Sequence, residues 1–484
     1  MKKSLCFTFV VFFHFMTFAQ PGWEVYHSGY LEESRGISTF GILNSTTKDV
    51  AWSIAYDGSG NNNEISAIAY TADGGVTWTV YDPVSLPEVT NLGISMVYPT
   101  SANTAYLTGY KRSFGNGGVF KTTNAGATWT RSTASNMFAN TASFCNVVYF
   151  WNSNTGFVQG DPVNGEFEMY RTTDGGNTWI PISGANIDNP LPGEYGVEHG
   201  VVFTPTGSSV WFKTNKGRLF RSTDQGQTWK ALPTFVTDFD SAIDKFSVTF
   251  KNDNEGWIIR SNGELYHSTN GGAAWTQMLP NYDWIGADTT NPNPFFGGDI
   301  SFIPGSDNTL VITESNTNLP VYGAAISYDG GQNWYKMIYY NFEGGPWEIL
   351  TPSDNIQHIS LGFRDDFFGL SGGLSHLNNP NDPNSAPTQG VFKYNIDTPF
   401  VAGETIAGLS VYPNPASTFV KVNTDGAALK NIAVYDIAGK EMLSFNNLSV
   451  NNMTINTSDL EKGTYLMKIE DANNNHQVVK VIIK

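Results

Sequence analysis

Carboxylate, aromatic and imidazole side chains gather in two stretches of the sequence. Asp161 follows a short apolar run as part of Gly160-Asp161-Pro162, and Glu194, Tyr195, Glu198 and His199 stand together in the segment 192–199. Carboxylates beside aromatic rings suit sugars, and two carboxylates across a channel could serve glycoside hydrolysis as acid and base. Asp-Pro and Gly-Glu pairs are also ordinary turn residues, so a purely structural role stays open.

Further polar and aromatic candidates lie in other segments between expected strands. None of these groups has the spacing of a zinc site or an EF-hand loop. There is no Gly-x-Gly-x-x-Gly loop, so no cofactor is predicted, and no metal site either. The additional candidates are Lys111, Arg112, Asp238, Asp240, Asp244, Asp283, Trp284, Asp288, Glu343, Trp347, Glu348 and His376.

One short loop recurs six times, and it indicates which elements must position these residues. Its Asp or Asn recurs at intervals of 51, 50, 50, 46 and 59 residues. A period near 50 with several short strands per repeat is typical of a β-propeller or a solenoid. The loop positions are Asp73, Asn124, Asp174, Asp224, Asn270 and Asp329, with a Trp shortly after each: Trp78, Trp129, Trp179, Trp229, Trp275 and Trp334.

Each loop position has a predicted structural role. The Asp or Asn side chain is expected to accept hydrogen bonds from backbone N–H groups just downstream, and the Gly two residues later to adopt positive φ. We expect the Trp to begin the next strand with its ring buried. These carboxylates are therefore interpreted as structural, not as catalytic or metal-binding groups.

The repeated loop resembles the Asp-box, or BNR repeat, of sialidases, xyloglucan hydrolases and the photosystem II assembly-factor propellers. The three-arginine carboxylate site and the Arg-Ile-Pro motif of sialidases are not matched in this sequence. The xyloglucan hydrolases pair two propellers, whereas one fits here. The assembly factors imply a non-catalytic binding role.

A second-strand pattern occurs seven times, once more than the loop. The seventh copy is followed by Gly390–Tyr394 but has no Trp strand of its own, and Gly22-Trp23-Glu24-Val25-Tyr26 near the N-terminus resembles the missing one. We therefore predict a seven-bladed β-propeller over residues 20–396 whose last blade is completed by the N-terminal strand. Asp161 and segment 194–199 are expected on the face opposite the repeated loops.

The N-terminus reads as a secretory signal, and the bulk composition agrees with export. Lys2 and Lys3 precede an apolar run that is too short to span a membrane, so residues 1–19 are predicted to be a signal peptide and no transmembrane segment is expected. The net charge of −17 argues against nucleic acid as a partner. Cys145 is the only cysteine expected to remain, which leaves no internal disulfide.

The C-terminal part has a different composition. A polar linker is predicted over 397–408 and a small antiparallel β-sandwich over 409–484, with a hairpin turn at Asp436–Gly439. Tyr412-Pro413-Asn414-Pro415, the Val434–Lys440 hairpin and the lysine-ended tail resemble the type A C-terminal sorting domain of the Bacteroidetes type IX secretion system. That resemblance implies export by this machinery, removal of the domain by a sortase-like peptidase, and a secreted or outer-membrane surface location.

Taken from the sequence alone, the fold class is all-β: a seven-bladed β-propeller followed by a small antiparallel β-sandwich. The predicted function is non-catalytic binding of a polysaccharide or a surface protein. The alternative is a glycoside hydrolase that uses carboxylates on the inter-blade loop face. The predicted ligand-binding residues are Asp161, Glu194, Tyr195, Glu198 and His199.

Overall fold

The computed structural model divides the chain into two compact units, Gly22–Ile396 and a second that contains Asp397–Lys484. The expected signal peptide and most of the expected linker lie outside the described residues. The residues that the structure describes are 22–30, 35–44, 49–57, 65–86, 92–112, 117–204, 207–236, 246–282, 298–313, 323–341, 348–349, 358–365, 368–373, 390–395, 406, 408–436, 441–473 and 476–484.

Five sheets of the first unit share one plan, in which four sequential strands pair antiparallel with their neighbours. The repeated loop connects the third strand of each sheet to the fourth. The strands are β2 (Arg35–Ile42), β3 (Ala51–Asp57), β4 (Ile68–Thr71) and β5 (Thr79–Tyr81); β6 (Leu92–Pro99), β7 (Ala105–Lys111), β8 (Gly118–Thr122) and β9 (Thr130–Arg131); β10 (Cys145–Phe150), β11 (Gly156–Val163), β12 (Glu166–Thr172) and β13 (Ile180–Pro181); β14 (Gly196–Phe203), β15 (Val210–Thr214), β16 (Arg218–Ser222) and β17 (Lys230–Pro233); and β18 (Phe246–Phe250), β19 (Gly256–Arg260), β20 (Leu265–Ser268) and β21 (Thr276–Gln277).

Two further sheets of this unit carry additional outer strands. The outer additions β22 and β27 pair parallel with their neighbours, an arrangement that the sequence pattern did not predict. In sheet order the strands are β22 (Asn281–Tyr282), β26 (Asn333–Lys336), β25 (Ala324–Ser327), β24 (Leu310–Thr313) and β23 (Ile300–Phe302); and β28 (Glu348–Ile349), β27 (Ile338–Asn341), β1 (Gly22–His27), β31 (Gly390–Asn395), β30 (Phe368–Gly372) and β29 (Ser360–Asp365).

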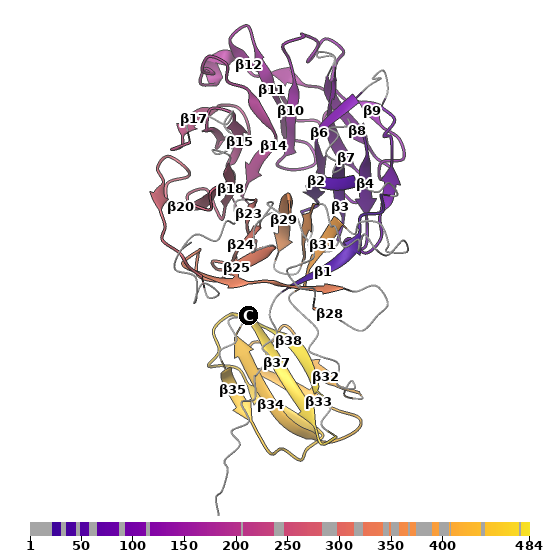
Figure 1. Cartoon of the computed structure of the whole chain (residues 1–484). Helices are drawn as coiled ribbons and strands as arrows, with labels where there is room; N and C mark the ends of the chain where they lie inside the picture. The colour runs from indigo at the N-terminus through magenta and orange to yellow at the C-terminus, as the bar shows by residue number, and fades with distance from the viewer. Residues whose placement is uncertain are drawn as a thin grey trace, which may run out of the picture. The chain divides into compact units, whose positions relative to one another are not determined.

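The innermost strands of these sheets form a closed ring. Each contacts the next in chain order, from β2 through β6, β10, β14, β18 and β23 to β29, and β29 contacts β2. Figure 1 shows the sheets radiating from these strands, with the indigo strand β1 beside the orange strand β31. The unit is a β-propeller.

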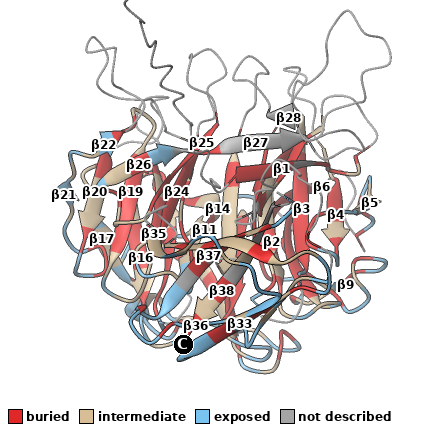
Figure 2. Ribbon diagram, turned by 90° about the horizontal axis from the view of Figure 1, so that it is seen from below, coloured by how far each residue is buried: buried red, intermediate tan, exposed pale blue. Residues whose placement is uncertain are grey.

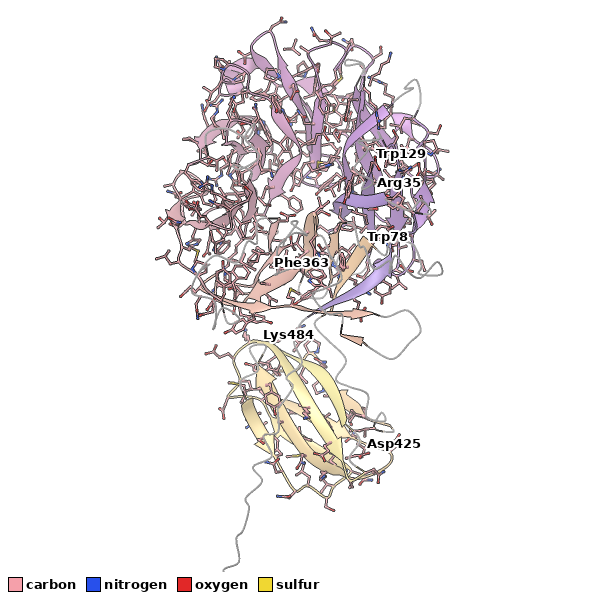
Figure 3. The ribbon with its side chains drawn as sticks, in the orientation of Figure 1. Arg35, Trp78, Trp129, Phe363, Asp425 and Lys484 are labelled. Atoms are coloured by element: carbon pink, nitrogen blue, oxygen red, sulfur yellow. The ribbon has the colours of Figure 1, made fainter. Side chains whose placement is uncertain are left out.

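The N-terminal strand closes the ring as the sequence predicted. Strand β1 pairs antiparallel with β31, and Trp23 stands opposite Tyr394. The Trp23 side chain is fully buried, and its ring meets those of Tyr394 at 5.8 Å and Phe363 at 6.2 Å between centroids. Figure 3 labels Phe363 in the sheet that contains β1. Residues from both ends of the propeller sequence therefore share one core cluster.

The cores lie between neighbouring sheets. In Figure 2 buried residues occupy the middle of the strands, while exposed residues gather in the connecting loops. Aromatic rings dominate these cores, for example Trp211 stacked on Phe250 at 3.8 Å between centroids. Such rings bury large apolar areas and hold adjacent sheets at fixed spacing.

The repeated loops have the predicted hydrogen bonds. In the third loop Asp174 accepts from the backbone N–H of Thr178 at 2.9 Å and from its hydroxyl at 2.6 Å. The Thr172 hydroxyl accepts from the N–H of Gly176, whose φ of 75° glycine adopts without steric cost. Three of the six Trp side chains, Trp129, Trp229 and Trp334, are buried, but those of Trp78, Trp179 and Trp275 are only partly covered.

Acid should destabilise the propeller through these loops. Hydrogen bonds from Thr178 hold the pKa of Asp174 at about 2, below the value of about 3.9 for an unfolded chain. The folded-state pKa is depressed, so this stabilisation is complete above pH 4 and is lost as the pH falls towards 2.

We expect Asp174→Asn to lower the proton uptake on unfolding between pH 4 and 2 by up to about one proton. Asn124 already fills the equivalent position and accepts the Thr128 N–H at 2.9 Å, so asparagine preserves the turn. Denaturant unfolding at several pH values, followed by tryptophan fluorescence, gives the slope of the free energy of unfolding against pH. That slope measures the proton uptake on unfolding. An unchanged slope would show that the loop carboxylate does not couple folding to pH.

The C-terminal unit is a small antiparallel β-sandwich, as predicted. A three-stranded and a four-stranded sheet enclose one apolar core that includes Val420, Ile432 and Met467. The tip of the expected hairpin turn lies outside the described residues, but its flanking strands β34 and β35 do pair antiparallel. The strands are β32 (Ser410–Tyr412), β33 (Phe419–Asn423), β36 (Asn452–Asn456), β35 (Glu441–Phe445), β34 (Leu429–Asp436), β37 (Gly463–Asp471) and β38 (His476–Ile483).

Candidate functional site

Asp161 lies on a β-bulge at the end of β11. The register between β11 and β12 shifts between Gly160 and Pro162, which leaves Asp161 as the extra residue. A bulge redirects the side chain of its extra residue. Here Oδ1 of Asp161 accepts from the side-chain amide of Asn146 at 2.6 Å and from the N–H of Gly196 at 3.1 Å. The carboxylate thus joins the third sheet to the first residue of β14 in the fourth.

Glu198 and His199 lie on a larger irregularity in the neighbouring inner strand. Gly196 pairs with Thr214 and Val201 with Phe212, so residues 197–200 stand opposite a single residue of β15. The backbone of His199 has a φ of 56°, a left-handed conformation that is uncommon outside glycine. The inner strands β2, β6 and β10 each shift register by only one residue at Ser38, Ser95 and Asn146. The fourth sheet is therefore distorted where the candidate residues are.

The carboxyl groups of Asp161 and Glu198 both have raised pKa values. Burial raises the pKa of Asp161 to about 6, although the hydrogen bonds from Asn146 and Gly196 oppose the shift. Burial, together with the negative charge of Asp161, raises the pKa of Glu198 to about 7. Both carboxyl groups therefore change protonation state near neutral pH. Such raised pKa values are common at functional sites and also occur in structural clusters.

His199 is neutral at physiological pH. Burial and the positive charge of Lys213 lower its pKa to about 4. Its Nδ1 is buried, and none of the described residues forms a hydrogen bond with that atom. The imidazole consequently adds no positive charge beside Glu198.

Glu194, a predicted ligand-binding residue, has a carboxylate that forms hydrogen bonds within the fold. It forms a buried ion pair with Arg218, whose Nε donates to Oε1 at 3.0 Å. The Thr214 hydroxyl donates to Oε1 at 2.5 Å, and the N–H of Leu191 donates to Oε2 at 2.7 Å. These bonds fasten the segment 189–195 to β15 and β16. The structure gives Glu194 a positioning role.

Tyr195 stands at the edge of a cavity of about 460 Å³ that Glu194 and Asp161 also line. The Tyr195 side chain is 43% exposed and that of Leu191 is 47% exposed, which leaves apolar surface open to a ligand. The N–H of Tyr195 donates to Asn215 at 2.8 Å and holds the residue in place. The remaining lining residues are Ala142, Pro162, Gly165, Pro190, Leu191, Pro192 and Gly193.

The structure also reveals polar residues that sequence reasoning missed. Gln159 is fully buried on β11, and its Oε1 has no hydrogen-bond partner among the described residues. Lys213 on β15 has a pKa lowered by burial, although the negative charge of Asp299 opposes the shift. Polar residues within apolar strands were the available signal, since Gln159 follows Phe157 and Val158 on β11 and Lys213 follows Trp211 and Phe212 on β15.

Lys111 and Arg112, the other sequence candidates whose side chains are described, do not line the cavity. Arg112 donates to the carbonyl of Ile65 at 2.8 Å and connects the first two sheets. Glu348 lies on β28, of which only the backbone is described. The candidates at 238, 240, 244, 283, 284, 288, 343, 347 and 376 lie outside the described residues. Within the described ranges, no three His, Cys, Asp or Glu side chains are grouped so that they could hold a metal ion.

Two family matches cover different parts of the chain. Residues 410–484 match the family described as "Secretion system C-terminal sorting domain". Residues 79–237, which include the candidate site, match "Photosynthesis system II assembly factor YCF48". The C-terminal match indicates secretion by the type IX system to the cell surface or the extracellular space. Among the described residues there is no helix with the length and apolarity to cross a membrane.

Individual relatives share a limited part of the sequence. The chain is 25% identical over 192 residues to the "Photosystem II assembly protein Ycf48" of Synechococcus sp. (strain JA-2-3B'a(2-13)), a match that covers 31% of this chain and 54% of that protein. A Ycf48 from Synechococcus sp. (strain JA-3-3Ab) is 24% identical over 194 residues, with the same coverage. The chain spans about half the length of these curated relatives.

Solved structures resemble the chain at low identity. A structure titled "YCF48 bound to D1 peptide" has a TM-score of 0.48 and 14% identity, and covers 77% of this chain and 96% of that one. The Niastella koreensis GH74 enzyme has a TM-score of 0.41 and 12% identity, over 91% of this chain and 78% of that one. From its ring of sheets, its repeated loops and the two family matches, the chain is a BNR-repeat β-propeller similar to the photosystem II assembly-factor propellers and carries a type IX secretion-system C-terminal sorting domain.

Proposed function

We propose that this secreted propeller is a non-catalytic binding protein whose ligand, a polysaccharide or a segment of a protein partner, sits in the cavity between the third and fourth sheets. One observation carries the proposal: exposed Leu191 and Tyr195 share a cavity of about 460 Å³ with the carboxyl group of Asp161. Apolar walls with a few converging polar groups are the usual composition of a ligand site.

The cavity wall is held rigid before any ligand arrives. Glu194, through Arg218, and Asn215, through the N–H of Tyr195, fix the segment that carries Leu191 and Tyr195. A preformed wall lowers the conformational entropy that binding must overcome. The curated relatives are named as assembly proteins, a role that also rests on binding.

A glycoside hydrolase is the second candidate, and the raised pKa values of Asp161 and Glu198 favour it. A carboxyl group that keeps its proton near pH 7 can act as a general acid, while a neighbouring ionised carboxylate acts as base or nucleophile. A glycan array combined with a reducing-sugar release assay separates the two candidates. Binding without release supports the binding protein, whereas release that Glu198→Gln abolishes supports the enzyme.

Truncating the cavity wall should weaken binding without affecting the fold. We expect Tyr195→Ala and Leu191→Ala each to lower affinity for the array-identified ligand by about tenfold, because each side chain offers apolar contact area. Thermal unfolding should stay within about 1 °C of the wild type, since nearly half of each residue is exposed and neither belongs to a core cluster of the described residues.

Leu279→Ala is the matched control, because Leu279 is 94% exposed and does not line the cavity. Its affinity should equal that of the wild type in the same binding measurement. Equal affinity of the Tyr195 and Leu191 variants as well would place the ligand elsewhere and refute the proposed site.

A further inference from the structure

Asp161, which lines the cavity, receives fewer hydrogen bonds from the described residues than its carboxyl group can accept. Both donors to Asp161, from Asn146 and Gly196, meet the same oxygen, Oδ1. Among the described residues no hydrogen bond reaches Oδ2 of Asp161. A ligand that completes this set must donate hydrogen bonds.

Gln159 is not among the residues that line the cavity, but it brings a second buried acceptor next to Asn146 and Gly196. It is completely buried, its Nε2 donates to the carbonyl of Gly160 at 2.9 Å, and its Oε1 has no partner among the described residues. The Gln159 amide packs closely against Gly196. A Cβ added to Gly196 would lie 2.6 Å from Oε1 of Gln159 and 2.7 Å from Nδ2 of Asn146. A buried acceptor without a donor costs free energy that a water molecule can recover.

The cavity walls fit a long side chain with a charged end. Pro190, Leu191, Pro192 and Tyr195 line the cavity together with Asp161. The methylene stem of lysine or arginine packs favourably on such apolar surface, while its head needs a carboxylate. The Tyr195 ring adds a face on which a cation can rest.

On this basis, and resting on the proposed function, we infer that the cavity binds a lysine or arginine side chain of a protein partner, with the cationic head at Asp161 and the stem against Leu191 and Tyr195. Ammonium and guanidinium groups only donate hydrogen bonds, which matches a site that offers acceptors. Sugar hydroxyls both donate and accept hydrogen bonds, so their acceptor lone pairs would find fewer partners at this end of the cavity.

The neighbouring charges are compatible with a cation at Asp161. Arg218 neutralises Glu194 in its buried ion pair, and His199 is uncharged at pH 7 because burial and Lys213 lower its pKa to about 4. Lys213 and Asp299 interact electrostatically with each other, and a negative charge on Glu198 faces Asp161. Asp161 is therefore the acidic residue of the cavity lining that is left to bind a cation.

The affinity for a cationic ligand should increase as the pH rises. The pKa of Asp161 is raised to about 6 and that of Glu198 to about 7, so acid protonates both groups and removes the charge that attracts the ligand. Affinity for a cation should rise from pH 5 to pH 8, and binding at pH 6.5 should release protons.

The test uses three capped tripeptides, Ac-Gly-Lys-Gly-NH₂, Ac-Gly-Arg-Gly-NH₂ and the uncharged Ac-Gly-norleucine-Gly-NH₂, with the full chain. Isothermal titration at about 150 mM NaCl suppresses general attraction to the acidic protein. We expect the two cationic peptides to bind at least about tenfold more tightly than the norleucine peptide. Asp161→Asn should erase that preference and flatten its pH dependence, while its side-chain oxygen keeps the bonds from Asn146 and Gly196.

Asp307→Asn is the matched control, because it removes one negative charge at an exposed position away from the cavity. It should retain the preference within twofold, and thermal unfolding should show both variants to be folded. Equal binding of the three peptides, or an unchanged preference in Asp161→Asn, would overturn the inference. A neutral glycan that Tyr195→Ala loses and Asp161→Asn retains would also overturn it, while leaving the proposed function standing.

Discussion

Replacing Trp23 by alanine should lower the free energy of unfolding of the propeller by about 3–5 kcal/mol, the usual loss for a fully buried tryptophan. Trp23 has no exposed surface and touches Tyr394 and Phe363, which belong to strands more than 300 residues later in the chain. The empty volume would loosen the pairing of β1 with β31 that closes the ring.

Tryptophan fluorescence in a denaturant titration measures this loss in the full chain. All 13 tryptophans precede residue 397, so the signal reports the propeller and not the C-terminal sandwich. Trp275→Ala is the matched control, since its ring is only partly buried, and it should cost clearly less. Equal losses in the two variants would mean that the N-terminal strand contributes no more than an ordinary outer strand.

The second large effect is expected at Glu194. Changing it to alanine should cost about 2–4 kcal/mol of propeller stability, because it leaves the partly buried Arg218 without its carboxylate. The hydrogen bonds from Thr214 and from the N–H of Leu191 are lost at the same time. The cavity wall should loosen, so ligand binding should weaken together with stability.

A double-mutant cycle identifies the cause of the loss at Glu194. Glu194→Ala combined with Arg218→Ala should destabilise the propeller by less than the sum of the single changes, because the second change removes the unpaired charge. Asp161→Asn serves as the comparison within the site and should lower binding with little loss of stability. Additive losses at Glu194 and Arg218 would show that the ion pair does not stabilise the wall.

Neighbouring positions in one predicted segment thus have different roles. Glu194 and Glu198 are four residues apart and chemically equivalent in the sequence, but only Glu194 meets an arginine. Arg218 belongs to the third strand of the same sheet, and no local pattern marks it as the partner. The contact with Arg218 therefore distinguishes Glu194, which holds the cavity wall in place, from a carboxylate that is available to a ligand.

The repeating plan of the propeller can be predicted from the order of residues along the chain. Turn chemistry is local: Asp174, Thr172 and Gly176 stand within five residues, so their hydrogen bonds are predictable from spacing alone. The resemblance of Trp23 and its neighbours to the later Trp strands also predicted the pairing of β1 with β31. The C-terminal sandwich followed from alternating strands and glycine-containing turns.

The chemistry of the candidate site depends on contacts between sheets that the residue order does not reveal. The bulge at Asp161 and the distortion at residues 197–200 depend on the register between strands, which a sequence does not display. The pKa values of Asp161 and Glu198 depend on burial and on each other's charge, and both arise when the third and fourth sheets meet. Local hydrogen bonds made the repeats predictable, whereas desolvation and contacts between sheets set the properties of the carboxylates.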